Sequence, residues 1–114
     1  MYNSFMMDNM DFNSEINLIR DQLIKKFKPE KIILFGSLAR GEINKNSDID
    51  LLIIKNDKQK RPFRIKAVFE AIRGIKRNFP LDALVYTQEE IEKRLVLGDH
   101  FIKNVFTEGK VLYG

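Results

Sequence analysis

The chain has 114 residues, of which 44% are hydrophobic and 32% charged, and it contains no cysteine. A chain of this length forms one domain with a single core, and without cysteine it has neither a disulfide framework nor a thiolate metal site. Its net charge of +4 weakly favours an anionic partner. No apolar stretch approaches the roughly 20 residues of a membrane-spanning helix, and residues 1–12 lack the features of a signal peptide, so a cytoplasmic protein is expected.

Hydrophobic periodicity predicts a regular order of helices and strands along the chain. Residues 1–11 are expected to form a flexible tail, and residues 12–114 a folded domain. Helices are predicted where apolar residues recur every three or four positions, and buried strands where they form short continuous runs. In chain order, the predicted elements are a helix over about 14–28, a strand over 31–35, a short helix over 38–40, a strand over 49–54, a helix over 62–79, a strand over 81–86, a helix over 87–96, a helix over 101–108 and an edge strand over 110–113.

Three prolines and one capping motif mark helix boundaries. Pro29 and Pro80 are expected to end the two long helices, and Pro62 to begin the second, where its missing N–H would be unpaired in any case. The sequence Thr87-Gln88-Glu89-Glu90 has the form of a capping box, so another helix should start there.

The order of the elements predicts an α/β fold. Three core strands alternate with helices. Only about a dozen residues join the first two strands, which is near the lower limit for a parallel crossover. We therefore expect a mixed sheet of three or four strands with flanking helices.

Two aspartates precede the hydrophobic part of the second strand. Asp48 and Asp50 are two positions apart, so their carboxylates should point to the same side at the start of the strand. Like charges so placed repel each other, and a hard cation such as Mg²⁺ removes that penalty. An isolated Asp-x-Asp is more often a solvated or capping pair, so the motif gains weight only from its neighbours.

A Gly-Ser turn provides that neighbour. Gly36 and Ser37 directly follow an apolar strand, where glycine allows a tight turn and close backbone approach. Backbone N–H groups at the start of the next helix, with the Ser37 hydroxyl, would form a site for phosphate oxygens. A plain strand-to-helix turn with a serine cap is the simpler reading of this motif alone. A phosphate site beside a metal site points to a nucleoside triphosphate.

The two motifs together resemble a known family. The stretch from Phe35-Gly36-Ser37-Leu38-Ala39-Arg40-Gly41 to Ser47-Asp48-Ile49-Asp50-Leu51 is similar throughout to the hallmark of minimal nucleotidyltransferase domains of the polymerase-β-like superfamily. The segments 101–104 and 109–113 also look like these domains. The resemblance covers nearly the whole chain beyond the first dozen residues and implies the nucleotidyltransferase fold.

The resemblance also implies roles for particular residues. Asp48, Asp50 and a third carboxylate, for which Asp82 is the candidate, would hold two Mg²⁺ ions. Gly36 and Ser37 would hold the phosphates of ATP. Independently of the family, an acid in an otherwise apolar strand is costly to bury unless it is paired or metal-bound, although Asp82 could instead stay in water at the strand start. Arg40 could contact phosphate or pair with a local acid.

The resemblance to family members of this size also implies a partner protein for this chain. They are often encoded beside a small helical HEPN protein, act as its antitoxin, and in some cases adenylylate a tyrosine of that toxin. The chain is too short for a separate acceptor domain, so the acceptor surface must come from a partner or a second copy. Two alternatives stay open: a binding module that neutralises a partner by contact alone, and an enzyme that adds nucleotides to RNA ends. The modest charge disfavours nucleic acid.

Overall fold

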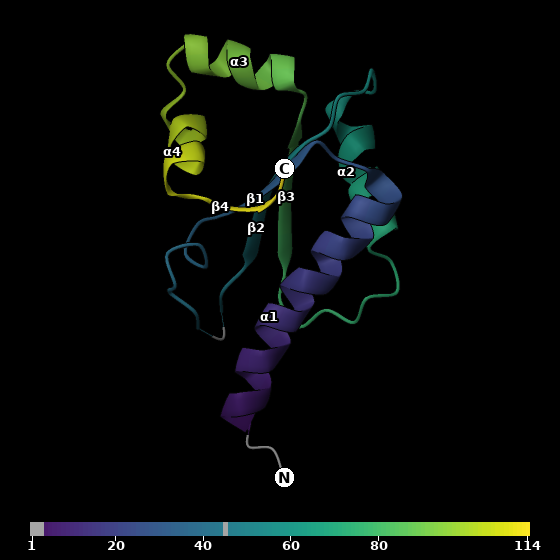
Figure 1. Ribbon diagram of the computed structural model, residues 1–114, viewed down its shortest axis with the longest axis vertical. Coiled ribbons are helices and arrows are strands. Elements are labelled where there is room, and N and C mark those ends of the chain that lie inside the picture. Colours follow the sequence, from purple (N-terminus) through teal and green to yellow (C-terminus); the bar gives the residue numbers. More distant parts are fainter. Residues whose placement is uncertain (1–3, 45) are drawn as a thin grey trace.

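The computed structural model describes residues 4–44 and 46–114 of the chain (Figure 1). Residues 1–3 of the expected tail lie outside the described residues, and the helix α1 begins at Ser4, ten positions before the predicted start. The elements are α1 (Ser4–Gln22), the π-helical turn η1 (Leu23–Phe27), β1 (Lys31–Phe35), β2 (Ile49–Ile54), α2 (Arg61–Ala71), β3 (Leu81–Tyr86), α3 (Gln88–Val96), α4 (His100–Glu108) and β4 (Lys110–Tyr113).

Four strands form one mixed sheet in the order β3-β2-β1-β4. The strand β1 pairs antiparallel with both β2 and β4, whereas β2 and β3 run parallel. The short connection between β1 and β2, near the lower limit for a parallel crossover, favours the antiparallel arrangement. The expectation of an α/β fold with a mixed sheet is therefore confirmed, and the three core strands have the predicted bounds.

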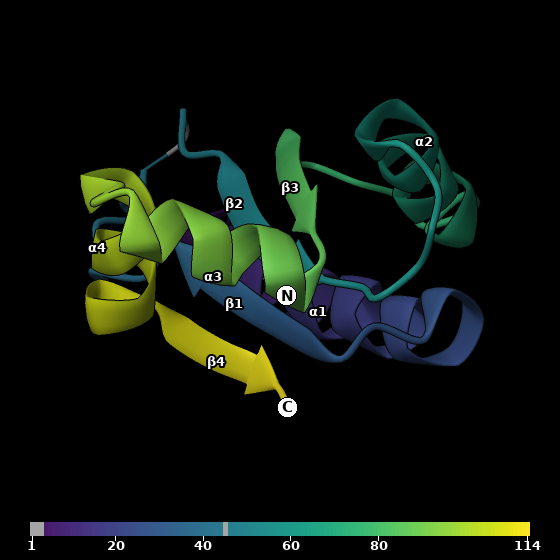
Figure 2. The same ribbon diagram turned by 90° about the horizontal axis from the view of Figure 1, so that it is seen from above.

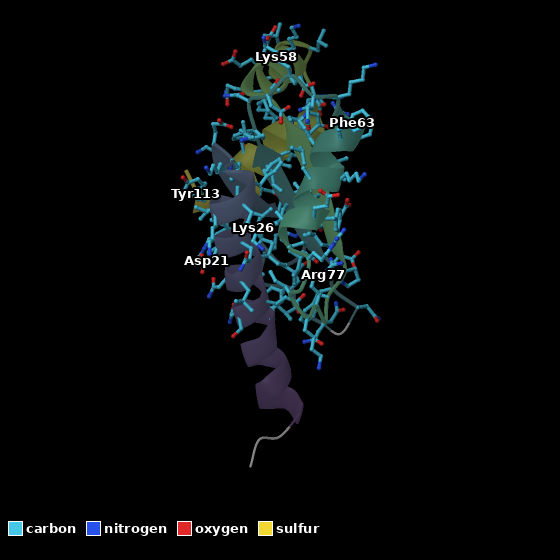
Figure 3. All side chains as sticks on the ribbon, turned by 90° about the vertical axis from the view of Figure 1, so that its right-hand side faces the viewer. Asp21, Lys26, Lys58, Phe63, Arg77 and Tyr113 are labelled. Atoms are coloured by element: carbon cyan, nitrogen blue, oxygen red, sulfur yellow. The ribbon has the colours of Figure 1, made fainter. Side chains whose placement is uncertain are left out.

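Helices cover both faces of the sheet. The helices α1 and α2 lie side by side over one face (Figure 3), and α4 lies on the opposite side of the sheet from α2 (Figure 2). The buried core beneath α1 and α2 is Phe12, Ile16, Ile19, Leu23, Phe27, Ile32, Leu34, Leu38, Ile49, Leu51, Ile53, Val68, Ala71, Ile72, Ala83 and Val85. The smaller core beneath α3 and α4 is Ile33, Leu52, Ile54, Tyr86, Ile91, Ile102 and Val105. Within the described residues, no helix is both long enough and apolar enough to cross a bilayer.

Besides α1, two other predicted helices differ from the structure. The helix α2 ends at Ala71 rather than at residue 79, and Gly74 follows with φ +95°, a value that favours glycine. Ile75 and Phe79 still pack against the core, but from irregular chain. The short helix predicted over 38–40 is instead a series of turns.

The C-terminal elements follow the prediction closely. Thr87 accepts a hydrogen bond from the N–H of Glu90, and the Glu90 carboxylate accepts one from the N–H of Thr87, which completes the predicted capping box. The helix α4 ends at Glu108 before Gly109, and β4 is an edge strand as expected.

A buried arginine ties α2 to the opposite layer. The Arg64 side chain is 4% exposed and forms two hydrogen bonds with Glu90, of 2.7 and 3.1 Å. It also donates to the carbonyls of Gln59 and Val85. The Arg64 partner lowers the pKa of Glu90 to about 2. A buried guanidinium is stable only with such partners, so this cluster fixes α2, β3 and α3 relative to one another.

Candidate active site

The turn after β1 brings the backbone against a carboxylate. Gly36 has φ +77°, and a Cβ atom added there would overlap the Oδ2 atom of Asp50. The turn's hydrogen bonds are donated by the N–H groups of residues 40–42 to the carbonyls of Ser37 and Leu38. The N–H groups that precede these donors are thus not used within the turn. Only glycine permits both this backbone conformation and this close approach.

The sheet register places two carboxylates side by side. Asp50 is opposite Asp82 in the parallel pair of β2 and β3, and opposite Phe35 in the antiparallel pair of β1 and β2. Residues directly opposite each other point to the same face of a sheet. That face is the one beneath α3 and α4, since its neighbours Leu52 and Leu84 belong to the smaller core. The two acids from separate strands therefore share one face, as the sequence argument required.

Asp48 lies immediately before β2 and is exposed, as is Asp82, whereas Asp50 is half-buried. Burial raises the pKa of the Asp50 carboxyl, and the negative charges of Asp82 and Asp48 raise it further. Asp50 is thus close enough to Asp82 and to Asp48 for their charges to act on it. Such repulsion on a half-buried carboxyl is typical of a site that takes a cation or a proton.

The carboxylates fit a hard divalent cation only in part. Within residues 4–44 and 46–114, no three acidic or histidine side chains are gathered closely enough to form a complete metal site. Mg²⁺ typically binds through one or two carboxylates, several waters and substrate phosphates, without an all-protein cage. Oxygen donors at Asp50 and Asp82, beside a glycine turn suited to phosphate, match that pattern.

A family comparison agrees with the observed fold. Residues 16–113 match the model of the family described as "Nucleotidyltransferase domain". The chain belongs to this nucleotidyltransferase family. The mixed-sheet topology of this nucleotidyltransferase domain is thus accounted for by its family.

Two relatives give this nucleotidyltransferase domain a closer context. It is 33% identical over 98 residues to a protein of Methanocaldococcus jannaschii named "Putative protein adenylyltransferase", and the match covers 86% of this chain and 90% of the relative. It also superposes on a chain in a crystal structure of a toxin–antitoxin with AMP-PNP. That match has a TM-score of 0.55 and 26% identity, and it covers 86% of this chain and 72% of the other.

Of the two possibilities that the sequence leaves for Arg40, a phosphate contact or a local acid, the structure shows a local acid, Glu42. The Nη2 atom of Arg40 is 3.4 Å from Oε2 of Glu42, and both side chains are about half or more exposed. Surface pairs of this kind contribute little to stability, so the guanidinium can exchange Glu42 for a phosphate at small cost. The roles of Arg40 and of the other predicted nucleotide and metal ligands in this nucleotidyltransferase domain stay predictions.

Ser47 supports Asp48 in a way that the sequence did not predict. Its hydroxyl accepts a hydrogen bond from the N–H of Asn44 at 2.9 Å and donates to the carbonyl of Glu42 at 3.4 Å. Ser47 is 4% exposed. The residue therefore closes the loop between β1 and β2 and sets the position from which Asp48 approaches the sheet. Its place directly before Asp48 was the only signal in the sequence.

Glu15 supports Asp82 from the far side of the sheet. It is 3% exposed, and its carboxylate accepts hydrogen bonds from the N–H groups of Asn78 at 2.6 Å and Phe79 at 3.0 Å. These residues lead directly into β3, where the carbonyl of Pro80 accepts from the N–H of Ile49 at 2.8 Å. An acid at a core-facing position of α1 was the available signal, but its partners are more than 60 residues away.

Proposed function

We propose that this protein transfers an adenylyl group from ATP to a hydroxyl of a partner protein. The observation that carries the proposal is the register of Asp50 with Asp82, next to the close approach of Gly36 to the Asp50 carboxylate. Nucleotidyl transfer requires phosphate binding and charge neutralisation at one place. The resemblance to a relative named for protein adenylylation and to a nucleotide-bound toxin–antitoxin supports the acceptor class.

The residues of the chain have separate tasks in this reaction. The N–H groups and hydroxyl of the Gly36–Ser37 turn would bind the outer phosphates, with Arg40 able to add a charge-assisted contact. Asp82, on the exposed edge of the site, would accept a hydrogen bond from the attacking hydroxyl and then its proton. The hydroxyl oxygen bonds to the α-phosphorus, the bond from that phosphorus to the bridging oxygen breaks, and pyrophosphate leaves.

Asp48, Asp50 and Asp82 would hold the divalent cations, two Mg²⁺ ions by analogy with the family. When bound, such ions supply neutralisation of the charge that develops on the phosphate oxygens. Asp50 would be the central ligand, because it lies opposite Asp82 in the sheet register and two positions from Asp48. The two outer acids, both exposed, remain accessible to water and substrate.

The acceptor is expected on a second protein. We propose a small helical protein of the HEPN toxin class, for which this protein would be the antitoxin. The competing possibility is neutralisation by contact alone, in which the acids would be dispensable.

The experiment uses the protein together with the partner that co-purifies with it. The pair is incubated with ATP and Mg²⁺, and intact-mass spectrometry detects an added AMP on the partner. Asp50→Asn and Asp82→Asn should abolish the adduct. Asp21→Asn is the matched control, since Asp21 is a 63% exposed acid on α1 that pairs with the adjacent Arg20, and it should retain activity.

Two results would contradict the proposal. Absence of an AMP adduct on any partner with the unaltered protein would exclude protein adenylylation. Neutralisation of the partner by Asp50→Asn at unchanged affinity would show that the acids are not required and would favour the contact mechanism.

A further inference from the structure

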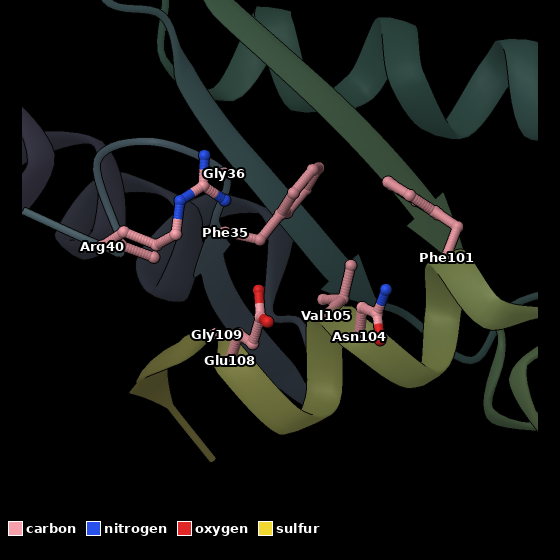
Figure 4. Close-up of a pocket in the computed structure, with 9 residues that line it drawn as sticks. Phe35, Gly36, Arg40, Phe101, Asn104, Val105, Glu108 and Gly109 are labelled. Carbon is pink, nitrogen blue, oxygen red and sulfur yellow. The ribbon is translucent and has the colours of Figure 1, made fainter. Parts of the chain in front are cut away.

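A pocket of about 260 Å³ adjoins the carboxylates on the face covered by α4. Its walls include Phe35, Gly36 and Arg40 from the end of β1 and the following turn, and Phe101, Asn104 and Glu108 from α4. Figure 4 shows Arg40 and Gly36 toward one end and Phe101 toward the other. Gly36 belongs both to this pocket and to the contact with Asp50, so the pocket begins where the predicted phosphate site ends.

The size of the pocket suits one ring system. Sites that bury a whole drug-sized ligand have volumes of about 300–1,000 Å³, so this pocket is too small for a complete nucleoside triphosphate. A ligand whose phosphates lie at the Gly36 turn could place only its base or its ribose here.

The chemistry of the walls favours the base. Phe101 packs edge-to-face on Phe35, with ring centroids 5.5 Å apart, yet 49% of its surface is exposed. A half-exposed ring at the pocket wall provides a stacking surface, and base–aromatic stacking tolerates any base. The walls carry one charge of each sign, on Arg40 and Glu108, so the pocket as a whole does not favour an anion, whereas a base presents neutral faces and N–H donors at its edge.

We propose that this pocket binds the nucleobase, with Phe101 stacking on it and Glu108 and Asn104 selecting a base that carries an exocyclic amino group. Glu108 has only acceptors, and an amino group is the donor that it can use. The Asn104 amide can donate to the ring nitrogen next to that amino group in adenine or cytosine. Uracil offers carbonyl oxygens at the same edge and is therefore disfavoured. The inference depends on the proposed nucleotide substrate.

The test measures binding to the full-length protein by calorimetry in Mg²⁺ buffer. The probes are ATP, UTP, inorganic tripolyphosphate, and purine riboside triphosphate, which lacks only the amino group of ATP. We expect ATP to bind roughly tenfold more tightly than tripolyphosphate, within the range that base stacking supplies. Purine riboside triphosphate and UTP should both bind more weakly than ATP.

Two variants and one control show whether the contribution of the base to ATP affinity comes from this pocket. Phe101→Ala should bring the affinity for ATP close to that for tripolyphosphate and leave the latter unchanged. Phe106→Ala is the matched control, because Phe106 is also on α4 and 40% exposed but does not line the pocket, and it should bind like the unaltered protein. Glu108→Ala should weaken ATP but not tripolyphosphate, and should remove the preference for ATP over purine riboside triphosphate.

Three other outcomes of the binding measurements would each refute either the base pocket or the proposed function. Equal affinities for ATP and tripolyphosphate, or no change on Phe101→Ala, would refute the base pocket and leave the proposed function standing. Tighter binding of both ligands to Glu108→Ala would show that phosphates occupy the pocket and would refute the assignment. Absence of Mg²⁺-dependent binding of any probe would refute the proposed function and this inference with it.

Discussion

Replacing Gly36 by alanine tests the geometry on which the site depends. Gly36 has φ +77° and Gly41, in the same turn, has φ +79°. An alanine in this left-handed region costs about 1–2 kcal/mol, so both variants should lose similar stability. They differ in surroundings, because a Cβ at Gly36 would overlap the Asp50 carboxylate and approach its Cγ to 3.3 Å, whereas nothing lies within 4 Å of a Cβ at Gly41.

The magnitudes separate folding from function. Domains of this size are stable by about 5–15 kcal/mol, so both variants stay folded, with melting temperatures lowered by roughly 4–8 °C per kcal/mol lost. In Gly36→Ala the Asp50 carboxylate must also move. A misplacement of about 1 Å in a catalytic site can cost on the order of 100-fold in rate. We expect that loss in Gly36→Ala and less than a threefold change in Gly41→Ala.

The assay pairs thermal unfolding with AMP transfer to the partner, measured well below both melting temperatures. Gly98→Ala provides a second control, since Gly98 has φ +80° with nothing within 4 Å and lies between α3 and α4 rather than in the turn. Equal activity losses in all three variants would show that backbone strain alone is responsible. Full activity of Gly36→Ala would refute the claim that the turn must approach Asp50 closely.

Three further predictions concern the metal, the anchor of β3 and acid stability. EDTA should lower ATP affinity at least tenfold, and Mg²⁺ should restore it; unchanged affinity in calorimetry would contradict the cation role. Glu15→Ala removes the buried carboxylate that accepts from the N–H groups of Asn78 and Phe79 and should cost about 1–3 kcal/mol in chemical denaturation, whereas Ser14→Ala, at an exposed position of the same helix, should cost little. The Glu90 pKa, lowered from 4.5 to about 2, gives stability that is complete above about pH 4.5 and lost as pH falls toward 2; Glu90→Gln should flatten that part of the stability curve, and an unaltered acid limb would refute the assignment.

The strands could be predicted from the sequence because local signals and tertiary packing agree. The apolar runs over 31–35, 49–54 and 81–86 are bounded by glycine, aspartate or proline, and the structure keeps those bounds. The mixed topology followed from the length of one connection. The placement of Asp82 near Asp50 was expected from the family resemblance, and the register of β2 with β3 accounts for it.

The errors arose where periodicity and backbone geometry disagree. Apolar residues continue at helical spacing to Phe79, but the helix ends at Ala71, since burial of Ile75 and Phe79 does not require a helical backbone. At the other end, the residues before Phe12, where methionines stand among polar residues, were predicted to be a tail, although α1 begins at Ser4. Periodicity reports which residues are buried, and only indirectly what conformation the chain adopts.

The buried charges could not be predicted because their partners are distant in sequence. Arg64 and Glu90 are 26 positions apart, and Glu15 bonds residues 63 and 64 positions away. Nothing in the sequence around these residues indicates partners so far along the chain. Only the packing of α1 and α2 against the sheet brings the partners together.

The position of the site is finally a consequence of strand register. Along β2 and β3, the face beneath α3 and α4 is apolar at Leu52 and Leu84 and becomes acidic one step earlier, at Asp50 and Asp82. Side chains alternate between faces, so a shift of β3 by one residue would place Leu81 or Ala83 beside Asp50 and turn Asp82 toward the core under α1 and α2. The hydrogen bond from Ile49 to Pro80 and the Glu15 anchor before it hold that register. Residues that never contact substrate therefore decide whether two carboxylates meet.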